Sequence, residues 1–319
     1  KIKSFNLGWT FGFGYFISNL YWITNSLTFD EIFKPLIPFA LIFIPLFLGI
    51  FYGLSTLVFS ILNPKKNFLS ILILATSLSI FEYIRGFIFG GFPWNLIAFS
   101  FVNYLDFIQL LSITGTYTFN SIIILLFLSP ATLFFNYKKN IKISIFIFSL
   151  LVIFVNYLWG NSNLKKYDLN KEKDLGFTIK IISPKININR YFQNENPKEF
   201  ISELILISKP NPIEETLFIL PEGILSSMYF EDLKNFKDLF SNNFSKKHKI
   251  ILGMNIYDNQ KIYNSLLVLN NDLNILGKYY KNKLVPFGEF LPFEKIFSNL
   301  GFKKITQGYM SFSAGNKRD

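Results

Sequence analysis

The sequence predicts a multi-pass α-helical membrane bundle followed by a water-facing α/β domain, and two observations support this division. The first is composition, because 50% of the 319 residues are hydrophobic, only 17% are charged and the mean hydropathy is +0.33. Ordinary soluble proteins are less apolar than this. The second is a change of pattern after Asn161, where long apolar segments give way to short runs separated by polar residues. We therefore expect a transmembrane domain over residues 1–160 and a second domain over residues 161–319.

Five apolar segments in the first domain are long enough to cross a membrane. A transmembrane helix needs about 20 mainly apolar residues. The segments that satisfy this length are residues 5–24, 36–62, 68–89, 107–130 and 141–160. Five crossings would leave the two ends of the domain on opposite sides of the membrane.

The distribution of lysines between successive loops predicts the orientation of these helices. Lysines gather before the first segment and in the loops after the second and fourth, whereas the other loops carry acidic residues or few charges. The lysine-rich positions are Lys1, Lys3, Lys65, Lys66, Lys138, Lys139 and Lys142. Because cytoplasmic loops are enriched in Lys and Arg, we expect these positions in the cytoplasm. The second domain is then extracytoplasmic.

The second domain reads as a layered α/β structure. Short runs rich in Ile, Leu and Val predict strands at residues 177–182, 216–220, 249–252, 263–269 and 275–280, and their continuous apolar character predicts that both sheet faces are covered. Apolar residues spaced three and four apart predict helices at residues 197–208 and 230–244.

Two charged residues follow predicted strands directly. Glu222 comes after the strand at 216–220, and Lys281 comes after the strand at 275–280. Ligands of open α/β sheets gather at the carboxyl ends of strands, so we expect the two side chains to share a site. A second acid, Glu289, follows Lys281 by eight positions across a Pro-Phe-Gly turn. Taken singly, Glu222 could be a solvated loop acid and Lys281 a surface lysine.

Charge and the content of cysteine and histidine exclude several functions. The net charge is +11, but the lysines follow the loop pattern of a membrane protein, so we expect no nucleic-acid partner. The sequence has no cysteine, and its one histidine, His248, lies in a lysine-rich run where we expect a surface position. We therefore expect no metal and no other cofactor. Because the chain starts at Lys1 rather than Met, we expect it to be a fragment.

Several short motifs closely resemble those of bacterial apolipoprotein N-acyltransferases, and they occur in the order expected for that family. The motifs are Gly12-Phe13-Gly14, Glu82-Tyr83-Ile84-Arg85-Gly86, Gly91-Phe92-Pro93-Trp94, Pro221-Glu222, Gly253-Met254-Asn255, Tyr263-Asn264-Ser265 and the run from Tyr279 to Glu289. The resemblance implies a nitrilase-like α-β-β-α sandwich on the extracytoplasmic side of the bacterial inner membrane. It also implies transfer of an acyl chain from a membrane phospholipid, through a cysteine thioester, to the N-terminal amine of a diacylglyceryl-cysteine apolipoprotein.

The same resemblance assigns roles to individual residues. Glu222 would be the general base, Lys281 would stabilise the oxyanion, and Glu289 would assist as a second acid. The cysteine of the family follows the lysine by some tens of residues and is absent here, so we expect it beyond Asp319 and expect the fragment alone to be inactive. The residues implied to contact substrate are Glu82, Arg85, Phe92, Trp94, Phe192, Asn264 and Pro292.

Alternatives remain for the membrane half and for the function. Glu82 and Arg85 lie three residues apart in an apolar helix, so they can pair, either for lipid-head-group binding and substrate access or for helix packing alone. Trp94 can equally be an anchor at the membrane interface. Alternative functions are an extracytoplasmic amidase of the nitrilase superfamily and an inactive membrane scaffold or transporter.

Overall fold

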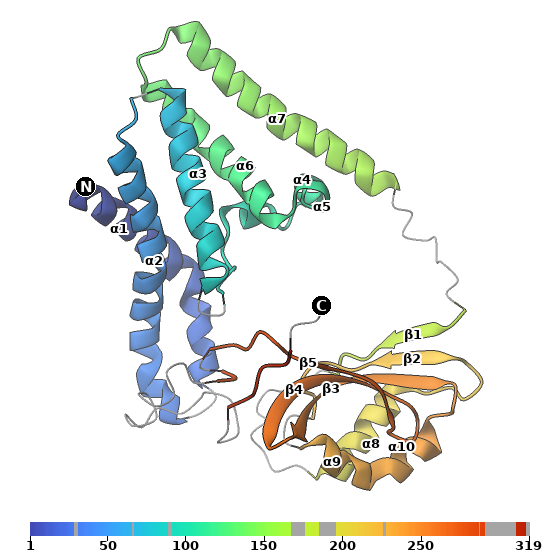
Figure 1. The fold of residues 1–319 in the computed structure, drawn as a ribbon. Coiled ribbons are helices and arrows are strands. Elements are labelled where there is room, and N and C mark those ends of the chain that lie inside the picture. Colours follow the sequence, from blue (N-terminus) through green and yellow to red (C-terminus); the bar gives the residue numbers. More distant parts are fainter. Residues whose placement is uncertain are drawn as a thin grey trace. The chain divides into compact units, whose positions relative to one another are not determined.

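The computed structural model describes residues 1–28, 31–65, 67–88, 91–166, 176–184, 196–225, 228–286, 288–290 and 311–316. The chain divides into two compact units, Lys1–Lys171 and Glu172–Asp319 (Figure 1). The domain boundary predicted after residue 160 falls inside the last helix of the first unit, which continues to Lys166. The assignment of transmembrane and catalytic domains stays a prediction.

The described residues of the first unit form helices and the loops that join them. Its α-helices are α1 (Ile2–Leu20), α2 (Ile37–Leu62), α3 (Phe68–Arg85), α4 (Leu105–Ile108), α5 (Leu111–Thr114), α6 (Thr116–Leu128) and α7 (Lys139–Lys166). Its 3-10 helices are η1 (Tyr21–Thr28), η2 (Glu31–Leu36), η4 (Ile97–Phe101) and η5 (Ser129–Phe134).

Among the described residues of this unit, four helices are long and apolar enough to cross a membrane: Phe33–Leu62, Phe68–Arg85, Thr116–Phe134 and Lys139–Lys166. The remaining predicted segment, residues 5–24, corresponds largely to α1, which has 19 residues but lacks the required hydropathy because polar residues and glycines interrupt it. The predicted helix 107–130 begins only at Thr116, since Gly115 has a φ of +74° and interrupts the helical path.

Glycines let α1 and α2 approach closely along their length. A Cβ atom on Gly8 would lie 2.5 Å from the carbonyl oxygen of Tyr52, and one on Gly12 would lie 2.8 Å from the Cα of Gly49. The Thr56 hydroxyl donates to the carbonyl of Ser4 at 2.8 Å. Contact through small residues is the usual way in which membrane helices pack.

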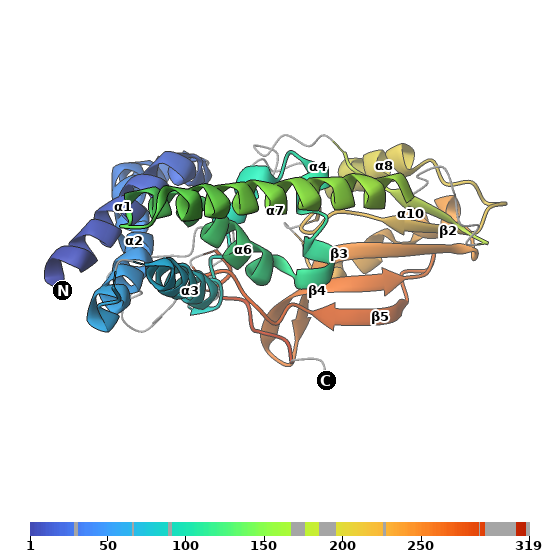
Figure 2. The ribbon, with the colours of Figure 1, turned by 90° about the horizontal axis from the view of Figure 1, so that it is seen from above.

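The second unit contains a five-stranded mixed sheet with the strand order β1-β2-β3-β4-β5 (Figure 2). The strands are β1 (Thr178–Ile181), β2 (Thr216–Ile219), β3 (His248–Asp258), β4 (Lys261–Leu269) and β5 (Ile275–Tyr280). β1, β2 and β3 are parallel, whereas β3, β4 and β5 pair antiparallel. All five predicted strands are present, although β3 is much longer than expected.

Helices pack on one face of this sheet (Figure 1). They are α8 (Pro197–Ser208), α9 (Phe230–Leu233), η7 (Lys234–Phe236) and α10 (Lys237–Asn243). α8 has the predicted bounds, because Pro197 occupies the first turn and the Asn196 side chain accepts a hydrogen bond from the Lys198 amide. The single helix predicted at 230–244 is instead divided into three short pieces.

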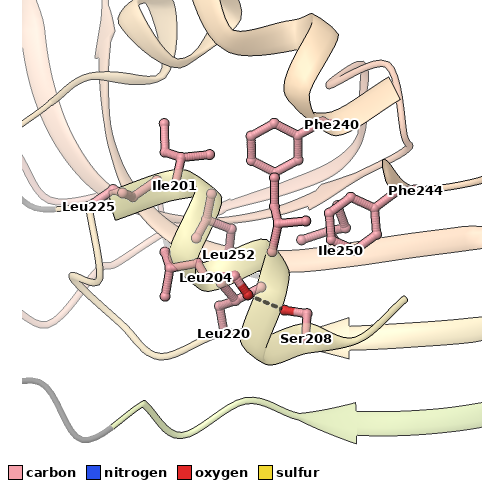
Figure 3. Close-up of a pocket in the computed structure, with 10 residues that line it drawn as sticks. Ile201, Leu204, Ser208, Leu220, Leu225, Phe240, Phe244, Ile250 and Leu252 are labelled. Atoms are coloured by element: carbon pink, nitrogen blue, oxygen red, sulfur yellow. Dashed lines mark hydrogen bonds between the residues drawn. The ribbon is translucent and has the colours of Figure 1, made fainter. Parts of the chain in front are cut away.

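The apolar core of the second unit lies between these helices and the sheet (Figure 3). Leu204 of α8 and Phe240 of α10 pack against Ile250 and Leu252 of β3 around a small apolar cavity. The Ser208 hydroxyl, the one polar side chain on the cavity wall, donates to the carbonyl of Leu204 at 2.7 Å. The cavity therefore presents no free polar or ionisable side chain that could bind or activate a reactant.

The opposite sheet face is apolar and, among the described residues, largely uncovered. Ile179 and Ile181 of β1 and Leu266 of β4 are exposed. The sequence predicts that both faces of the sheet are covered. In the described part of the unit, helices cover one face only. A second sheet of a sandwich is not among the described residues.

His248 differs from the expectation of a surface position, since it is fully buried at the start of β3. Its Nδ1 accepts a hydrogen bond from the Ser245 amide at 3.0 Å, and its Nε2 lies 2.9 Å from the carbonyl oxygen of Asn211. These two contacts tie β3 to the Asn211 turn.

Candidate functional site

The sheet topology brings the two predicted strand ends to one edge. β2 runs parallel to β3, and β5 runs in the same direction because two antiparallel pairings separate it from β3. The carboxyl ends of β2 and β5 therefore lie at the same edge of the sheet. Glu222 follows β2, and Lys281 follows β5.

The chain after β2 crosses over β3 to bring Glu222 toward β4. The Leu220 amide donates to the carbonyl of Ile251, which continues the pairing with β3 by one residue. Beyond it, the backbone of Glu222 lies directly over Gly253, where a Cβ atom would come within 2.7 Å of the Glu222 Cα. Gly253 thus provides the close approach that the Glu222 position requires.

Lys281 lies between two carboxylates. Its Nζ is 3.2 Å from Oε1 of Glu222 and 3.0 Å from Oε1 of Glu289. The Glu222 side chain is 64% exposed, whereas that of Glu289 is 10% exposed. Glu222 is therefore the carboxylate that a reactant can reach, and Glu289 is the internal partner of the lysine.

Asn264 on β4 joins the same two carboxylates. Its Nδ2 donates to Oε1 of Glu222 at 2.7 Å and to Oε1 of Glu289 at 2.8 Å. The resemblance implied a substrate contact for Asn264, and in this structure its amide nitrogen holds the two acids. No local pattern indicates this role, because Asn264 is 42 residues from Glu222 along the chain.

A short turn fixes Glu289. The Glu289 amide donates to the carbonyl of Val285, and the Val285 amide donates back to Oε2 of Glu289, each at 2.8 Å. One carboxylate oxygen thus closes the turn while the other faces Lys281 and Asn264. The Pro-Phe-Gly motif recognised in the sequence lies inside this turn, although Phe287 is outside the described residues.

The contacts shift the pKa values of the exposed pair in opposite directions. The hydrogen bond from Asn264 lowers the pKa of Glu222, and the neighbouring Lys281 adds to this effect against partial burial. Partial burial by itself lowers the pKa of Lys281, but its bonds to Glu289 and Glu222 outweigh burial, and the pKa is raised. At neutral pH the site contains an ionised acid beside a fixed cation.

Two other predicted positions, Phe192 and Pro292, lie outside the described residues. The structure therefore brings together Glu222, Asn264, Lys281 and Glu289 of the residues predicted in this unit. No cluster of three or more potential metal ligands of the His, Cys, Asp or Glu type occurs in the part of the chain that the structure describes.

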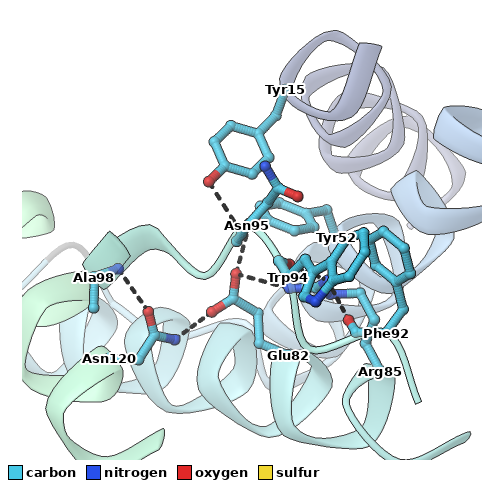
Figure 4. A network of polar contacts seen from close by, with 9 residues as sticks. All are labelled: Tyr15, Tyr52, Glu82, Arg85, Phe92, Trp94, Asn95, Ala98 and Asn120. Atoms are coloured by element: carbon cyan, nitrogen blue, oxygen red, sulfur yellow. Dashed lines mark hydrogen bonds and ion pairs between the residues drawn. The ribbon is translucent and has the colours of Figure 1, made fainter. Parts of the chain in front are cut away.

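Glu82 and Arg85 form a separate network inside the first unit (Figure 4). Both side chains are at most 1% exposed, and they form an ion pair at 3.9 Å. The Tyr52 hydroxyl of α2 donates to Glu82 at 2.7 Å, and the Asn120 amide of α6 donates to its other oxygen. Glu82 on α3 is thereby joined to two neighbouring helices.

Arg85 binds the loop that contains Phe92 and Trp94. Its Nη1 donates to the carbonyls of both residues at 2.7 Å, and its guanidinium lies 5.1 Å from the centre of the Phe16 ring. The Asn120 side chain accepts from the amide of Ala98 farther along the loop. The predicted pair is therefore formed, and it holds the loop from within the helical unit.

This arrangement leaves aromatic rings at the surface of the loop. Trp94 is 49% exposed, and its ring centre lies 5.2 Å from that of Trp22 and 5.4 Å from that of Phe92. Of the residues predicted here, Trp94 can reach a ligand directly, whereas Glu82 and Arg85 are enclosed by protein.

Comparison with known proteins agrees with the motifs. Residues 1–129 match a family model described as the apolipoprotein N-acyltransferase N-terminal domain. Proteins named apolipoprotein N-acyltransferase are similar over nearly the whole chain. The protein of Rickettsia typhi is 32% identical over 319 residues, covering 97% of this chain and 61% of the relative. The proteins of Rickettsia prowazekii and Brucella suis are 31% and 26% identical, covering 97% and 98% of this chain and 61% and 60% of the relatives.

The chain thus spans about three fifths of the length of these relatives. Within that span the similarity extends from the helical unit into the unit that contains Glu222 and Lys281. The chain is therefore similar over nearly its whole length to proteins named apolipoprotein N-acyltransferase, the family that its sequence motifs resemble.

Proposed function

We propose that this chain contributes the base and the oxyanion-stabilising cation of an apolipoprotein N-acyltransferase. The acyl donor is a membrane phospholipid, and the acceptor is the N-terminal amine of a diacylglyceryl-cysteine apolipoprotein. The observation that carries the proposal is the position of the Lys281 ammonium, 3.2 Å from an exposed, ionised Glu222. The names of the relatives supply the reaction class.

The first step forms a thioester on a cysteine that is not among these 319 residues. Glu222 accepts the thiol proton, and the sulfur attacks the ester carbonyl carbon. Lys281 donates to the oxygen that becomes negative as the carbonyl double bond opens. When the double bond re-forms, the ester C–O bond breaks. The leaving alkoxide takes the proton from Glu222 and departs as the lysophospholipid alcohol.

The second step transfers the acyl group to nitrogen. The acceptor amine attacks the thioester carbonyl, Lys281 again stabilises the oxyanion, and the C–S bond breaks as the amide forms. The proton lost by the nitrogen passes through Glu222 to the sulfur and restores the thiol. Glu289, enclosed and bound to Lys281 at 3.0 Å, keeps the ammonium in position throughout.

The helical unit would hold the chain in the bacterial inner membrane with the second unit outside the cytoplasm. The four apolar helices support membrane insertion. Close contact of α1 with α2 supports α1 as a fifth crossing, because α2 compensates for its lower hydropathy. The exposed rings of Trp94 and Trp22 would then meet lipid or the acyl chains of the substrates.

The second unit would form part of a nitrilase-like α-β-β-α sandwich. The exposed apolar sheet face with Ile179, Ile181 and Leu266 supports this, since an apolar face is stable only when another layer covers it and shields it from water. One helix layer and one sheet are present in the described residues, and a further sheet would complete the sandwich.

The test is acyl transfer by the complete protein in detergent, using a phospholipid with a labelled acyl chain and a diacylglyceryl peptide. Glu222→Gln should lower the rate by about 10²–10⁴-fold and Lys281→Met by about 10²–10³-fold. Lys278→Met is the matched control, because Lys278 lies on β5, three residues before Lys281, and likewise pairs with an acid, Asp258.

The labelled intermediate should be sensitive to hydroxylamine, as a thioester is. Near-normal labelling of Glu222→Gln would remove Glu222 as the base. Release of ammonia from small amides without any acylated peptide would contradict the acyltransferase and support the amidase instead.

A further inference from the structure

Residues Phe312 to Gly315 form a short strap that binds three backbone carbonyls around the candidate site. The Phe312 amide donates to the carbonyl of Glu289 at 2.8 Å, and the Gly315 amide donates to the carbonyl of Lys281 at 2.9 Å. Between them, the Ser313 amide donates to the carbonyl of Ile262 on β4 at 2.7 Å. Two of the three acceptors are thus the backbones of candidate site residues.

The strap binds the backbone carbonyls of Lys281 and Glu289, whereas the sheet and the turn bind their backbone amides. The Lys281 amide donates to the carbonyl of Asn264, and the Glu289 amide donates to that of Val285. Each residue therefore has its N–H fixed by β4 or by its own turn and its C=O fixed by the strap. Lys281 follows the last residue of β5, so apart from its amide bond to Asn264 the pairing of β5 with β4 no longer fixes it.

Gly315 lies too close to the sheet for any side chain. A Cβ atom at this position would be 2.3 Å from the carbonyl oxygen of Tyr280 and 2.7 Å from its Cβ. Tyr280 is the residue directly before Lys281, and its ring stacks on Tyr263 at 4.3 Å. Tyr280 therefore cannot move aside without displacing either the Lys281 backbone or the strap.

We propose that the strap positions the Lys281 ammonium against Glu222 and Glu289, and that Gly315 is the residue on which this positioning depends. The catalytic consequence rests on the proposed function, whereas the structural one does not. The ammonium lies 3.0 Å from Glu289 and 3.2 Å from Glu222, so a shift of about 1 Å breaks one contact. Misplacement of that size can lower a rate by about 10²-fold.

The experiment compares Gly315→Ala with Gly277→Ala. Gly277 lies on β5, the strand that Gly315 packs against, but a Cβ atom there would meet Val268 at an ordinary 3.7 Å, so the control makes the same change where space is available. The first readout is the rate at which an amine-reactive acylating reagent labels Lys281, measured by mass spectrometry. Loss of the carboxylate contacts should raise this rate several-fold in Gly315→Ala and leave it unchanged in Gly277→Ala.

The second readout is acyl transfer by the complete protein. Gly315→Ala should lower kcat by about 10–100-fold with KM changed much less, because positioning acts on the reacting groups rather than on binding. Unchanged Lys281 labelling in a folded Gly315→Ala protein would overturn the proposal. Altered labelling together with an absence of transfer by every form of the protein would instead overturn the proposed function and leave the strap in place.

If Gly315→Ala does not fold, amide hydrogen exchange of the unaltered protein tests whether the strap is formed. The amides of Phe312, Ser313 and Gly315 should exchange slowly because each is hydrogen-bonded, while the amide of the exposed Ala314 should exchange fast. Equal, fast exchange at all four positions would overturn the strap.

Discussion

Asn264 and Lys281 donate to the same two carboxylate oxygens. The amide nitrogen of Asn264 lies 2.7 and 2.8 Å from them, and the ammonium of Lys281 lies 3.2 and 3.0 Å from them. Two carboxylates this close repel each other unless donors lie between them. Two acids, Glu222 and Glu289, are therefore joined by two donors. The neutral Asn264 amide makes the same number of hydrogen bonds to them as the Lys281 ammonium.

Replacement of Asn264 by Leu should move the pH dependence of the reaction. The hydrogen bond from Asn264 is the main cause of the lowered pKa of Glu222, so its loss should raise that pKa. The acid limb of the profile of kcat/KM against pH, which reports ionisation of Glu222, should then move to higher pH. Asn242→Leu, at an exposed position on α10, should leave the limb in place. If the acid limb of the kcat/KM profile does not move in Asn264→Leu, ionisation of Glu222 is not what that limb reports.

Replacement of Arg85 by Met should destabilise the helical unit strongly. It would leave Glu82 buried without a cation and the carbonyls of Phe92 and Trp94 without their donor. Breaking a buried pair in this way costs about 3–5 kcal/mol of unfolding free energy. Unfolding of the protein in detergent micelles measures the change.

The matched control for Arg85→Met is Lys34→Met. Lys34 pairs with Glu31 at 2.5 Å, but the two side chains are 46% and 84% exposed, so the expected loss is about 1 kcal/mol or less. Equal stabilities for the two variants, with weakened phospholipid binding only in Arg85→Met, would favour direct head-group binding over the structural role.

Much of the second unit was predictable because its signals are local. α8 follows from Asn196, Pro197 and the spacing of its apolar residues, and the strands follow from runs of Ile, Leu and Val. The proximity of Glu222 and Lys281 followed from one general rule about strand ends. These inferences needed no knowledge of which strand pairs with which.

The features that the sequence did not predict depend on contacts between distant residues. His248 lies next to Lys246 and Lys247, which indicate a surface, yet its buried ring contacts Phe218, Phe244 and the carbonyl of Asn211, 37 residues away. Gly315 carries no local signal either, since its constraint comes from Tyr280. Local sequence patterns predict where helices and strands lie. Which residues are buried, and which backbones approach closely, depends on how those elements pack together.

The glycines of α1 offer a test of helix packing with an internal control. Gly12→Ala should destabilise the contact with α2 by about 1–3 kcal/mol, because the added methyl group would lie 2.8 Å from the Cα of Gly49. Gly14 has no neighbouring atom within 4 Å, so Gly14→Ala should be neutral or slightly stabilising in the helix. Unfolding in detergent compares them, and equal effects would contradict the packing of α1 on α2.

The last prediction concerns the side of the membrane on which the second unit lies, and it does not depend on whether α1 crosses the membrane. α7 separates the lysines at 138 and 139 from the second unit, so a single crossing by α7 places them on opposite sides whatever α1 does. Whether α1 also crosses decides only the side of Lys3. With Lys139 in the cytoplasm, as its lysine-rich loop predicts, the second unit lies outside.

These 319 residues contain no cysteine, so single cysteines test this once the proposed nucleophilic cysteine of the complete protein has been replaced by serine. Lys246→Cys, exposed in the second unit, should react with a membrane-impermeant maleimide in intact spheroplasts, whereas Lys139→Cys should react only after lysis. Lys3→Cys should behave like Lys139→Cys if α1 is a fifth crossing and like Lys246→Cys if it is not. Labelling of Lys246→Cys only after lysis would place Glu222 and Lys281 in the cytoplasm, away from the extracytoplasmic substrates that the proposed reaction requires.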